Sequence, residues 1–268
     1  MTDIKVIVSD FDGTLLDDEK HLPKQFPALL HELRQRDIHF IAASGRQYYN
    51  IRAQFPKELA NQVDYIAENG ALTVMNNEIY SIAEMPYEDV AAIVDTVRNL
   101  PGCYPILCGA RCSYYENDFP EINRNTALYY ARMKLIDDVM DYVKQDRICK
   151  IAVFNSHQAE TVCYPALLPF ADHMQVALSG DCWVDIMNAS VNKGTALTTM
   201  LNHMNISPDQ CMAFGDYLND IELLQASGHP YAMENAHPQL RKLFKNTSGH
   251  NNHAGVIHTI CRELNITL

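Results

Sequence analysis

Long apolar runs are missing from this sequence of 268 residues, and none approaches the roughly 20 residues that a membrane-spanning helix needs. The strand-like sequence that begins at Ile4 also leaves no room for a signal peptide. CxxC pairs are missing as well, and the spacing of Cys103, Cys108 and Cys112 matches no common zinc site. We therefore expect a cytoplasmic protein without membrane contacts, whose eight cysteines are reduced structural thiols.

Positive charge is also scarce in the sequence. Lys and Arg number 21 against 33 Asp and Glu, so the net charge is −12. We expect no nucleic-acid partner, because binding of that kind depends on Lys and Arg that neutralise phosphates. A small phosphorylated metabolite remains compatible with this charge, because a single metal ion can reverse the local field. The oligomeric state cannot be predicted from the sequence.

The order of apolar patterns predicts the fold class. With 47% hydrophobic and 20% charged residues and no repeat, the chain is typical of a globular protein with one domain and an insertion, or with two modest domains. Strand and helix patterns alternate over the first 82 residues, which predicts a parallel sheet with right-handed crossovers. The expected elements are strands at 4–9, 38–43 and 64–67, helices at 23–36 and up to residue 54, and a hairpin at 72–82 around Asn76-Asn77.

The middle of the chain has a different pattern. From about Met85 to Asp181, helices mix with short strands, and the alternation of strand and helix returns after Trp183. We therefore expect an α/β core built from residues 1–82 and 185–268, with residues 83–184 forming an inserted α+β domain. The expected elements are helices at 86–99, 157–168, 193–205, 221–226, 238–244 and 254–264, and strands at 150–154, 211–214 and 231–233.

Two carboxylates follow the first strand, and they are the first candidates for chemistry. Residues two apart in an extended segment point to the same side, so Asp10 and Asp12 can face one site while Phe11 packs on the other side. Gly13 lets the backbone turn close to a ligand. Open α/β sheets bind ligands at this edge. The alternative is an ordinary Asp-Gly turn after a strand.

Other strand ends and helix starts supply further polar groups. Ser44 ends the second strand near a helix start, which suits a phosphate oxygen, although an ordinary Ser N-cap would have the same sequence. Lys193 stands at a helix start, where the helix dipole disfavours a cation, so it would suit a place beside carboxylates and a phosphate. A solvated surface lysine is the alternative.

A second acidic segment follows the short strand that begins at Cys211. Asp216 and Asp220 stand there with Asn219, although a capped helix start would also favour acids. Four acids at two strand ends need a cation, and oxygen ligands of this kind suit Mg²⁺. One carboxylate could then attack phosphorus and form an aspartyl-phosphate, while a second protonates the leaving oxygen and later takes a proton from water. Mg²⁺ and a lysine would offset the charge of the transferring phosphoryl group.

Four stretches of the sequence resemble, in order, the four motifs of the haloacid dehalogenase superfamily, and above all its Cof-type phosphatases. That group carries a large α+β cap domain between the second and third motifs, so the resemblance implies a Rossmann-like parallel sheet core with an inserted α+β cap. The stretches are Asp10-Phe11-Asp12-Gly13-Thr14, Ser44-Gly45-Arg46, Asn192-Lys193-Gly194 and Gly215-Asp216…Asn219-Asp220, and Glu68-Asn69-Gly70-Ala71 and Met233-Glu234-Asn235-Ala236 resemble secondary signatures of the group.

The resemblance implies a role for each matching residue. Asp10 matches the nucleophile and a metal ligand, and Asp12 the general acid/base, whose backbone carbonyl also binds Mg²⁺. Ser44 matches the phosphoryl-binding hydroxyl, and Lys193 the lysine that orients the nucleophile and neutralises the phosphate.

The resemblance extends to the second acidic segment. Asp216 matches the direct acidic metal ligand, and Asp220 a residue that holds the metal, often through water. Asn219 matches a neighbouring group near the phosphate or the metal ligands, and Gly45 and Arg46 match positions close to the phosphate and substrate.

Departures from the family pattern are few. Glu234 stands where glycine is common, and His253 stands where the family often has an acid. His250 and His253 could suggest a metal site, but no Cys, Asp or Glu joins them, and a loop before the last helix is the simpler interpretation.

The residue Asp12 separates the possible functions. The superfamily's dehalogenases lack the second Asp and its ion-pumping ATPases carry Thr there, whereas a sugar or nucleoside leaving group needs an acid. Response-regulator receivers are much shorter and lack the DxD order. The sequence thus predicts a Mg²⁺-dependent phosphatase that acts on a small phosphorylated metabolite, such as a sugar phosphate. A phosphomutase or phosphotransferase, or a non-catalytic sensor, remains as an alternative.

Substrate specificity is expected from the cap, where candidate residues are Tyr114, Tyr115, Tyr129, Tyr130 and Arg132.

Overall fold

A computed structural model describes residues 3–179 and 181–268. The chain divides into two compact units, one formed by Met1–Tyr80 with Asn192–Leu268 and the other by Ser81–Val191. The predicted return to the first unit at residue 185 falls inside strand β11 (Trp183–Asn188). That strand pairs with β9 (Ile148–Phe154) in the sheet of the second unit, so the second unit extends further along the chain than expected.

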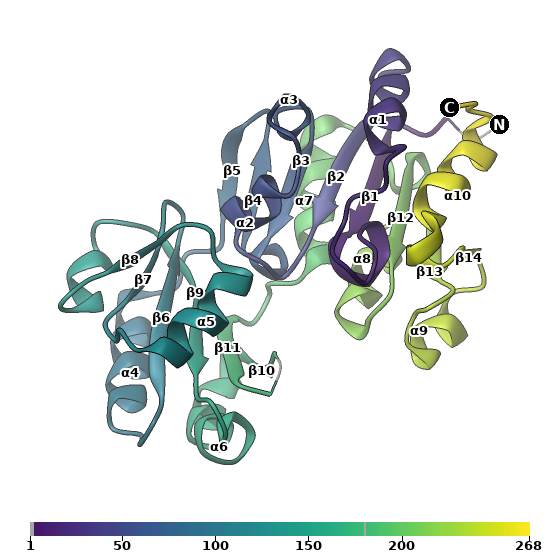
Figure 1. Cartoon of the computed structure of the whole chain (residues 1–268). Coiled ribbons are helices and arrows are strands. Elements are labelled where there is room, and N and C mark those ends of the chain that lie inside the picture. Colours follow the sequence, from purple (N-terminus) through teal and green to yellow (C-terminus); the bar gives the residue numbers. More distant parts are fainter. Residues whose placement is uncertain (1–2, 180) are drawn as a thin grey trace. The chain divides into compact units, whose positions relative to one another are not determined.

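The first sheet has eight strands within the described residues, in the order β14-β13-β12-β1-β2-β3-β4-β5 (Figure 1). The pairs from β14 to β3 are parallel, and β4 is antiparallel to β3. The predicted α/β class is therefore confirmed, with an antiparallel extension at one side. The strands are β1 (Val6–Asp10), β2 (His39–Ala43), β3 (Asp64–Ala67), β4 (Leu72–Met75), β5 (Glu78–Ile82), β12 (Cys211–Gly215), β13 (His229–Met233) and β14 (Thr247–Ser248).

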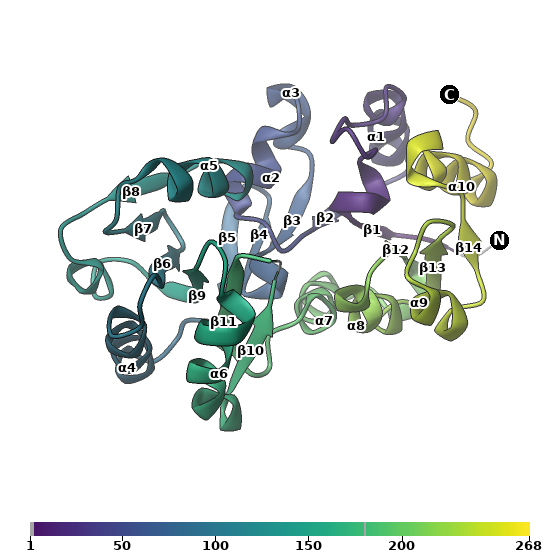
Figure 2. The same cartoon turned by 60° about the horizontal axis from the view of Figure 1, so that its bottom comes forward.

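Helices cover both faces of this sheet, with α1 and α10 on one face and α7, α8 and α9 on the other (Figure 2). This explains why β1 is apolar throughout, since a strand buried on both faces cannot alternate with polar residues. On α1, the residues Phe26, Leu29, Leu30 and Leu33 form the buried stripe. The helices are α1 (Phe26–Gln35), α2 (Tyr48–Ala53), α3 (Lys57–Ala60), α7 (Lys193–Met204), α8 (Ile221–Gln225), α9 (Pro238–Leu243) and α10 (Gly255–Leu264).

The predicted hairpin joins β4 and β5, which are neighbours in the sheet. Its two connecting residues, Asn76 and Asn77, have φ angles of +51° and +67°. Asparagine tolerates this left-handed region better than most residues, which is why the Asn-Asn pair marks the turn.

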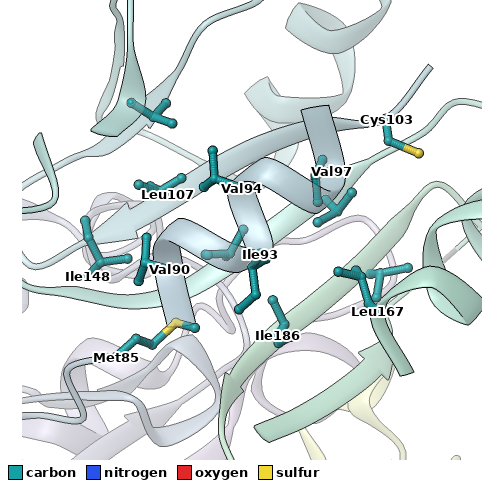
Figure 3. Packing of buried hydrophobic residues seen from close by; sticks show 14 of the residues in the cluster. Met85, Val90, Ile93, Val94, Val97, Cys103, Leu107, Ile148, Leu167 and Ile186 are labelled. Atoms are coloured by element: carbon teal, nitrogen blue, oxygen red, sulfur yellow. The ribbon is translucent and has the colours of Figure 1, made fainter. Parts of the chain in front are cut away.

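The second unit has its own sheet, in the order β10-β11-β9-β6-β7-β8, and is of the expected α+β type. Helix α4 carries Val90, Ile93, Val94 and Val97 at helical spacing, and they form much of the core on one face of the sheet (Figure 3). The remaining elements are β6 (Tyr104–Gly109), β7 (Ser113–Tyr115), β8 (Met133–Leu135), β10 (Met174–Leu178), α4 (Tyr87–Arg98), α5 (Pro120–Tyr129) and α6 (Tyr164–Leu167).

The helix predicted at 157–168 forms from Ala159, but its hydrogen bonding changes along its length. A π-helical turn, Ala159–Cys163, runs directly into the short α6, which carries Pro165 near its start, and Leu168–Asp172 continues as a 3₁₀ turn. Proline cannot donate a backbone hydrogen bond, so the regular α-helical pattern is interrupted near Pro165 although the chain stays helical. In the part of the chain that the structure describes, every helix is too short or too polar to cross a bilayer.

Candidate functional site

Asp10 is the last residue of β1, and its side chain is buried. The chain then makes a wide turn, η1 (Phe11–Leu15), in which Gly13 has a φ of +76°. A Cβ atom at Gly13 would lie 2.5 Å from Oδ2 of Asp216, so only glycine fits here. Phe11 is fully buried and its ring centroid lies 5.6 Å from that of Phe55, which confirms the predicted packing.

Lys193 is the first residue of α7 and is 1% exposed, so a solvated surface lysine is excluded. Its Nζ lies 2.5 Å from Oδ1 of Asp10 and 2.7 Å from Oδ1 of Asp220. The helix start is held by Asn192, whose side chain accepts a hydrogen bond from the backbone N–H of Thr195. The ends of β1 and β12 and the start of α7 therefore meet at this lysine.

Three carboxylates gather around the lysine. One oxygen each from Asp10, Asp216 and Asp220 lies within 4.8 Å of the others, and this is the one such group of three found in the described residues. Asp220 is fully buried, and its Oδ2 accepts hydrogen bonds from the backbone N–H groups of Asp216 and Tyr217 at 3.0 and 3.1 Å. The hydroxyl of Thr14 donates to Oδ1 of Asp216 at 2.9 Å.

The charges in this cluster are unbalanced. Burial, and then the charge of Asp220, raises the pKa of Asp10 well above its usual range, and the same two causes raise the pKa of Asp216 to about 6. Burial acts to lower the pKa of Lys193, but Asp10 and Asp220 more than offset this effect, so the lysine stays charged. One cation cannot neutralise three carboxylates. The all-oxygen donor set fits a hard divalent cation such as Mg²⁺.

Asp12 lies outside this cluster, because η1 turns its carboxylate toward two cations. Arg46 donates to both carboxylate oxygens, from Nε at 2.6 Å and from Nη2 at 2.5 Å. Lys20 lies 2.9 Å away on the same carboxylate. Burial acts to raise the pKa of Asp12, but Arg46 and then Lys20 lower it below its usual range. Asp12 thus forms an ion pair with Arg46. The spacing of Asp10 and Asp12 predicted that both face one site, and it did not predict this ion pair.

Ser44 follows β2 and is buried. Its Oγ accepts a hydrogen bond from the backbone N–H of Arg46 at 3.1 Å, as an N-cap side chain would. Its carbonyl accepts from the N–H of Asn69 at 3.1 Å, and a Cβ at Gly45 would lie 2.9 Å from Oδ1 of Asn69. Asn219 donates to that same oxygen at 3.3 Å. Asn69 therefore connects the ends of β2, β3 and β12.

The stretch Glu68–Gly70, which resembles a secondary signature of the family, forms a turn that contacts the segments carrying the motifs. Glu68 and Asn69 have φ angles of +50° and +55°, so the chain turns sharply after β3. A Cβ at Gly70 would lie 2.3 Å from the carbonyl oxygen of Asn192, so glycine allows the turn to touch the start of α7.

Sequence reasoning missed several contacts at the site. Lys20 lies in an exposed loop outside every motif, so no pattern indicated its ion pair with Asp12. Thr14 and Asn235 stand inside quoted stretches, but no role was derived for either. The amide of Asn235 donates to the carbonyl of Gly13 at 2.7 Å.

The other candidates take ordinary structural places. The rings of His250 and His253 lie 5.7 Å apart, but neither joins a group of three metal-ligating side chains in the described part of the chain. Tyr114 donates to Asp146 at 2.9 Å within the second unit. The rings of Tyr129 and Tyr130 lie against Trp183 at 6.3 Å. Tyr114 and Tyr130 are buried and pack the second unit, whereas Tyr129 is exposed.

Comparisons with known proteins agree with this geometry. The 5-amino-6-(5-phospho-D-ribitylamino)uracil phosphatase YbjI of Escherichia coli K12 is 29% identical over 264 residues, covering 97% of this chain and 96% of that protein. The HMP-PP phosphatase of Escherichia fergusonii is 28% identical over 239 residues, covering 87% of this chain and 85% of that protein. A solved protein of Streptococcus mutans UA159 has a TM-score of 0.83 at 26% identity, with 98% and 100% of the two chains covered.

The match to a family model covers nearly the whole chain. It spans residues 7–260, from β1 to α10, and so includes all the strand ends that carry the acidic cluster, Lys193 and Ser44. The order of the motifs, the parallel sheet and the inserted α+β unit all fit that match. The chain belongs to the haloacid dehalogenase-like hydrolases.

Proposed function

We propose that this protein is a Mg²⁺-dependent phosphatase that hydrolyses a small phosphomonoester through an aspartyl-phosphate intermediate. The observation that carries the proposal is the buried Lys193, held between Asp10 and Asp220 with Asp216 beside them. This arrangement supports a role for Asp10 as the nucleophile and leaves negative charge for a divalent cation. The bound Mg²⁺ would be held by Asp10, Asp216, Asp220 and the backbone carbonyl of Asp12, and it would offset charge on the phosphoryl group.

The first step is an attack by the Asp10 carboxylate on phosphorus, while the bond from phosphorus to the leaving oxygen breaks. Lys193 keeps Asp10 oriented and offsets its negative charge. The Ser44 hydroxyl and the groups around Gly45 and Asn219 hold the phosphoryl oxygens. Water then attacks the aspartyl-phosphate, which releases phosphate and restores the carboxylate.

Asp12 handles the protons of both steps. Its protonated carboxyl group donates a proton to the leaving oxygen, and the resulting carboxylate later accepts one from the attacking water. The ion pairs with Arg46 and Lys20 favour the ionised form, which suits the second step. For the first step Asp12 must carry a proton. Arg46 and Lys20 must therefore release the Asp12 carboxyl group and contact the bound substrate instead.

The relatives support a small substrate. YbjI is named for a phosphorylated ribitylaminouracil, and the second relative for HMP-PP. We infer that this chain takes a sugar phosphate or a similar phosphorylated metabolite, and that its second unit acts as the cap that contacts the part of the substrate beyond the phosphate. The net charge of −12 argues against a polyanionic substrate.

The direct test is the release of phosphate from an aryl phosphate by the wild type and by Asp10→Asn, with Mg²⁺ present. We expect the variant to lose activity by at least about a thousandfold, because an amide cannot form the acyl-phosphate. Asp141→Asn, an exposed acid of the second unit, is the matched control. Substantial turnover by Asp10→Asn would rule out the covalent mechanism. A panel of phosphorylated metabolites would then identify the substrate, and an isomerised product without free phosphate would indicate a mutase.

A further inference from the structure

The turns that follow β1, β13 and β14 are connected by hydrogen bonds next to the site. The strands β1, β12, β13 and β14 are parallel neighbours, so the turns that follow them emerge at the same edge of the sheet. The turn after β1 is η1, the turn after β13 contains Asn235, and the turn after β14 contains Asn251 in η8 (Asn251–His253). Both asparagines hold the turn that follows Asp10.

The two asparagines form a relay of hydrogen bonds. Nδ2 of Asn235 donates to the carbonyl of Gly13 at 2.7 Å, and its Oδ1 accepts from the backbone N–H of Asn251 at 3.1 Å. Both ends of the Asn235 amide are therefore used, which fixes its orientation. Nδ2 of Asn251, which is 1% exposed, donates to the carbonyl of Leu16 and to Oδ1 of Asp18, both at 3.0 Å.

The hydrogen bond from Asn235 is made to Gly13, the residue of the turn whose backbone angles are least restricted. Gly13 has φ +76° and ψ 0°, and glycine can leave this conformation at little steric cost. Its peptide group also contains the N–H of Thr14, whose hydroxyl holds Asp216, and the nitrogen of Gly13 is bonded to the carbonyl carbon of Asp12. A change in the backbone angles of Gly13 would therefore shift the carbonyl and carboxylate of Asp12 relative to Thr14, which supports Asp216.

We propose that Asn235 is a positioning residue, which fixes the Gly13 peptide and thereby holds Asp12 in place for proton transfer and for Mg²⁺ binding. The inference rests on the proposed phosphatase function, and it assigns a purpose to a residue outside the four motifs. Asn251 acts through Asn235, because its backbone N–H keeps the amide donor turned toward Gly13.

Two variants of Asn235 separate positioning from packing. Asn235→Asp keeps the shape and the acceptor for Asn251, but it places an oxygen against the Gly13 carbonyl. Asn235→Ala removes the side chain. We expect both to lower kcat by about 10- to 100-fold with KM changed less than about threefold, as for other residues that orient catalytic groups. The matched control is Asn252→Ala, an exposed neighbour in η8 whose side chain pairs with Asp18, and we expect wild-type kcat there.

Two further readouts distinguish a positioning role from a structural one. An alkyl phosphate needs a proton on its leaving oxygen and p-nitrophenyl phosphate does not, so the Asn235 variants should lose at least about tenfold more kcat/KM on the alkyl ester. Calorimetric titration with Mg²⁺ alone should show affinity reduced about tenfold in both variants. Wild-type Mg²⁺ affinity in both variants, or equal losses on the two esters, would overturn the inference. Absence of phosphatase activity in the wild type would instead overturn the proposed function, and the Mg²⁺ titration would still decide on Asn235.

Discussion

Asp216 shows how a residue that suits a metal site can weaken the protein without its metal. Burial and the nearby charge of Asp220 raise its pKa to about 6, which means that the ionised form is destabilised in the folded state. Its Oδ1 is held by Thr14, so the carboxylate keeps its place despite the repulsion. The site is thus arranged for a cation and not for its own stability.

We predict that Asp216→Asn stabilises the metal-free protein at pH 7.5 by about 1–2 kcal/mol, because it removes a buried negative charge and can keep the hydrogen bond from Thr14. Urea unfolding with EDTA present measures this change in the free energy of unfolding. With Mg²⁺ in place of EDTA the wild type should gain stability and the variant should not. A variant less stable than the wild type in EDTA would contradict the prediction.

The same raised pKa predicts a dependence on pH. The folded protein binds a proton at Asp216 more tightly than the unfolded chain does, so in EDTA the stability contributed by this group is greatest below pH 4 and declines as the pH rises to about 6. Protons compete with Mg²⁺ for the carboxylate. Added Mg²⁺ should therefore raise Tm by several degrees at about pH 7.5 and by little at about pH 5. Equal shifts at both pH values would count against Asp216 as a ligand.

At the scale of single residues, the sequence predicted the acids and the lysine because each stands at a strand end or helix start. The unfavourable place of Lys193 at a helix N-terminus favoured a site beside carboxylates but left a solvated lysine as the alternative, and only the structure shows that it is buried. The direction of the Asp12 carboxylate could not be predicted, because the period-two rule holds only while the chain is extended. Gly13 ends that regularity, and Arg46 and Lys20 come from other segments.

At the scale of elements, α7 and α8 pack so closely in the first unit that only glycine fits at their contact. A Cβ at Gly194, the second residue of α7, would lie 2.2 Å from the carbonyl oxygen of Glu222 in α8. The contact is with backbone, so it cannot be relieved by a side-chain rotation. This spacing sets the position of α7 and hence of Lys193.

We predict that Gly194→Ala destabilises the protein by about 2 kcal/mol or more, because the new methyl group forces α7 away from α8. Activity should fall as well, since Lys193 moves with the helix. Denaturant unfolding and phosphate release measure the two effects. Thr199→Ala, at an exposed position of the same helix, should leave both unchanged. A wild-type Tm for Gly194→Ala would show that the helices can separate freely.

Elements with strong periodicity were predicted closely, and those shaped by tertiary pairing were not. The strand at 64–67 and the helix α4 lie where the pattern placed them. Helix α5 was missed, because only Ile122 and Thr126 along its length are buried and its apolar stripe is weak. The short strands β7 and β8 gain their structure from pairing across the sheet, which their few residues do not reveal.

At the scale of the whole molecule, the two units differ in how they use the chain. The second unit is one continuous segment with its own core, whereas the first is assembled from both ends. The sequence predicted this division from a break in the alternation of strand and helix. The exact return point was not predicted, because β11 is a mostly apolar, buried strand whose sequence does not distinguish one sheet from the other.

We predict that residues 81–191 expressed alone fold into a monomeric α+β domain with a cooperative urea transition, since their core residues all lie within the segment. Circular dichroism and urea titration test this. The complementary pieces 1–80 and 192–268 should each fail to fold alone, because β1 pairs with β12. A broad urea transition that lacks a folded-state baseline would show that the segment needs the rest of the chain.

The place of β1 between β2 and β12 has a consequence for synthesis on the ribosome. Asp10 meets Lys193, which lies 183 residues later in the chain, so the nascent protein has no complete site until translation is almost finished. Until residues 211–215 emerge, one edge of β1 is open and apolar. During that interval the open edge of β1 can pair with other chains, so chaperones would be needed most at that stage of synthesis.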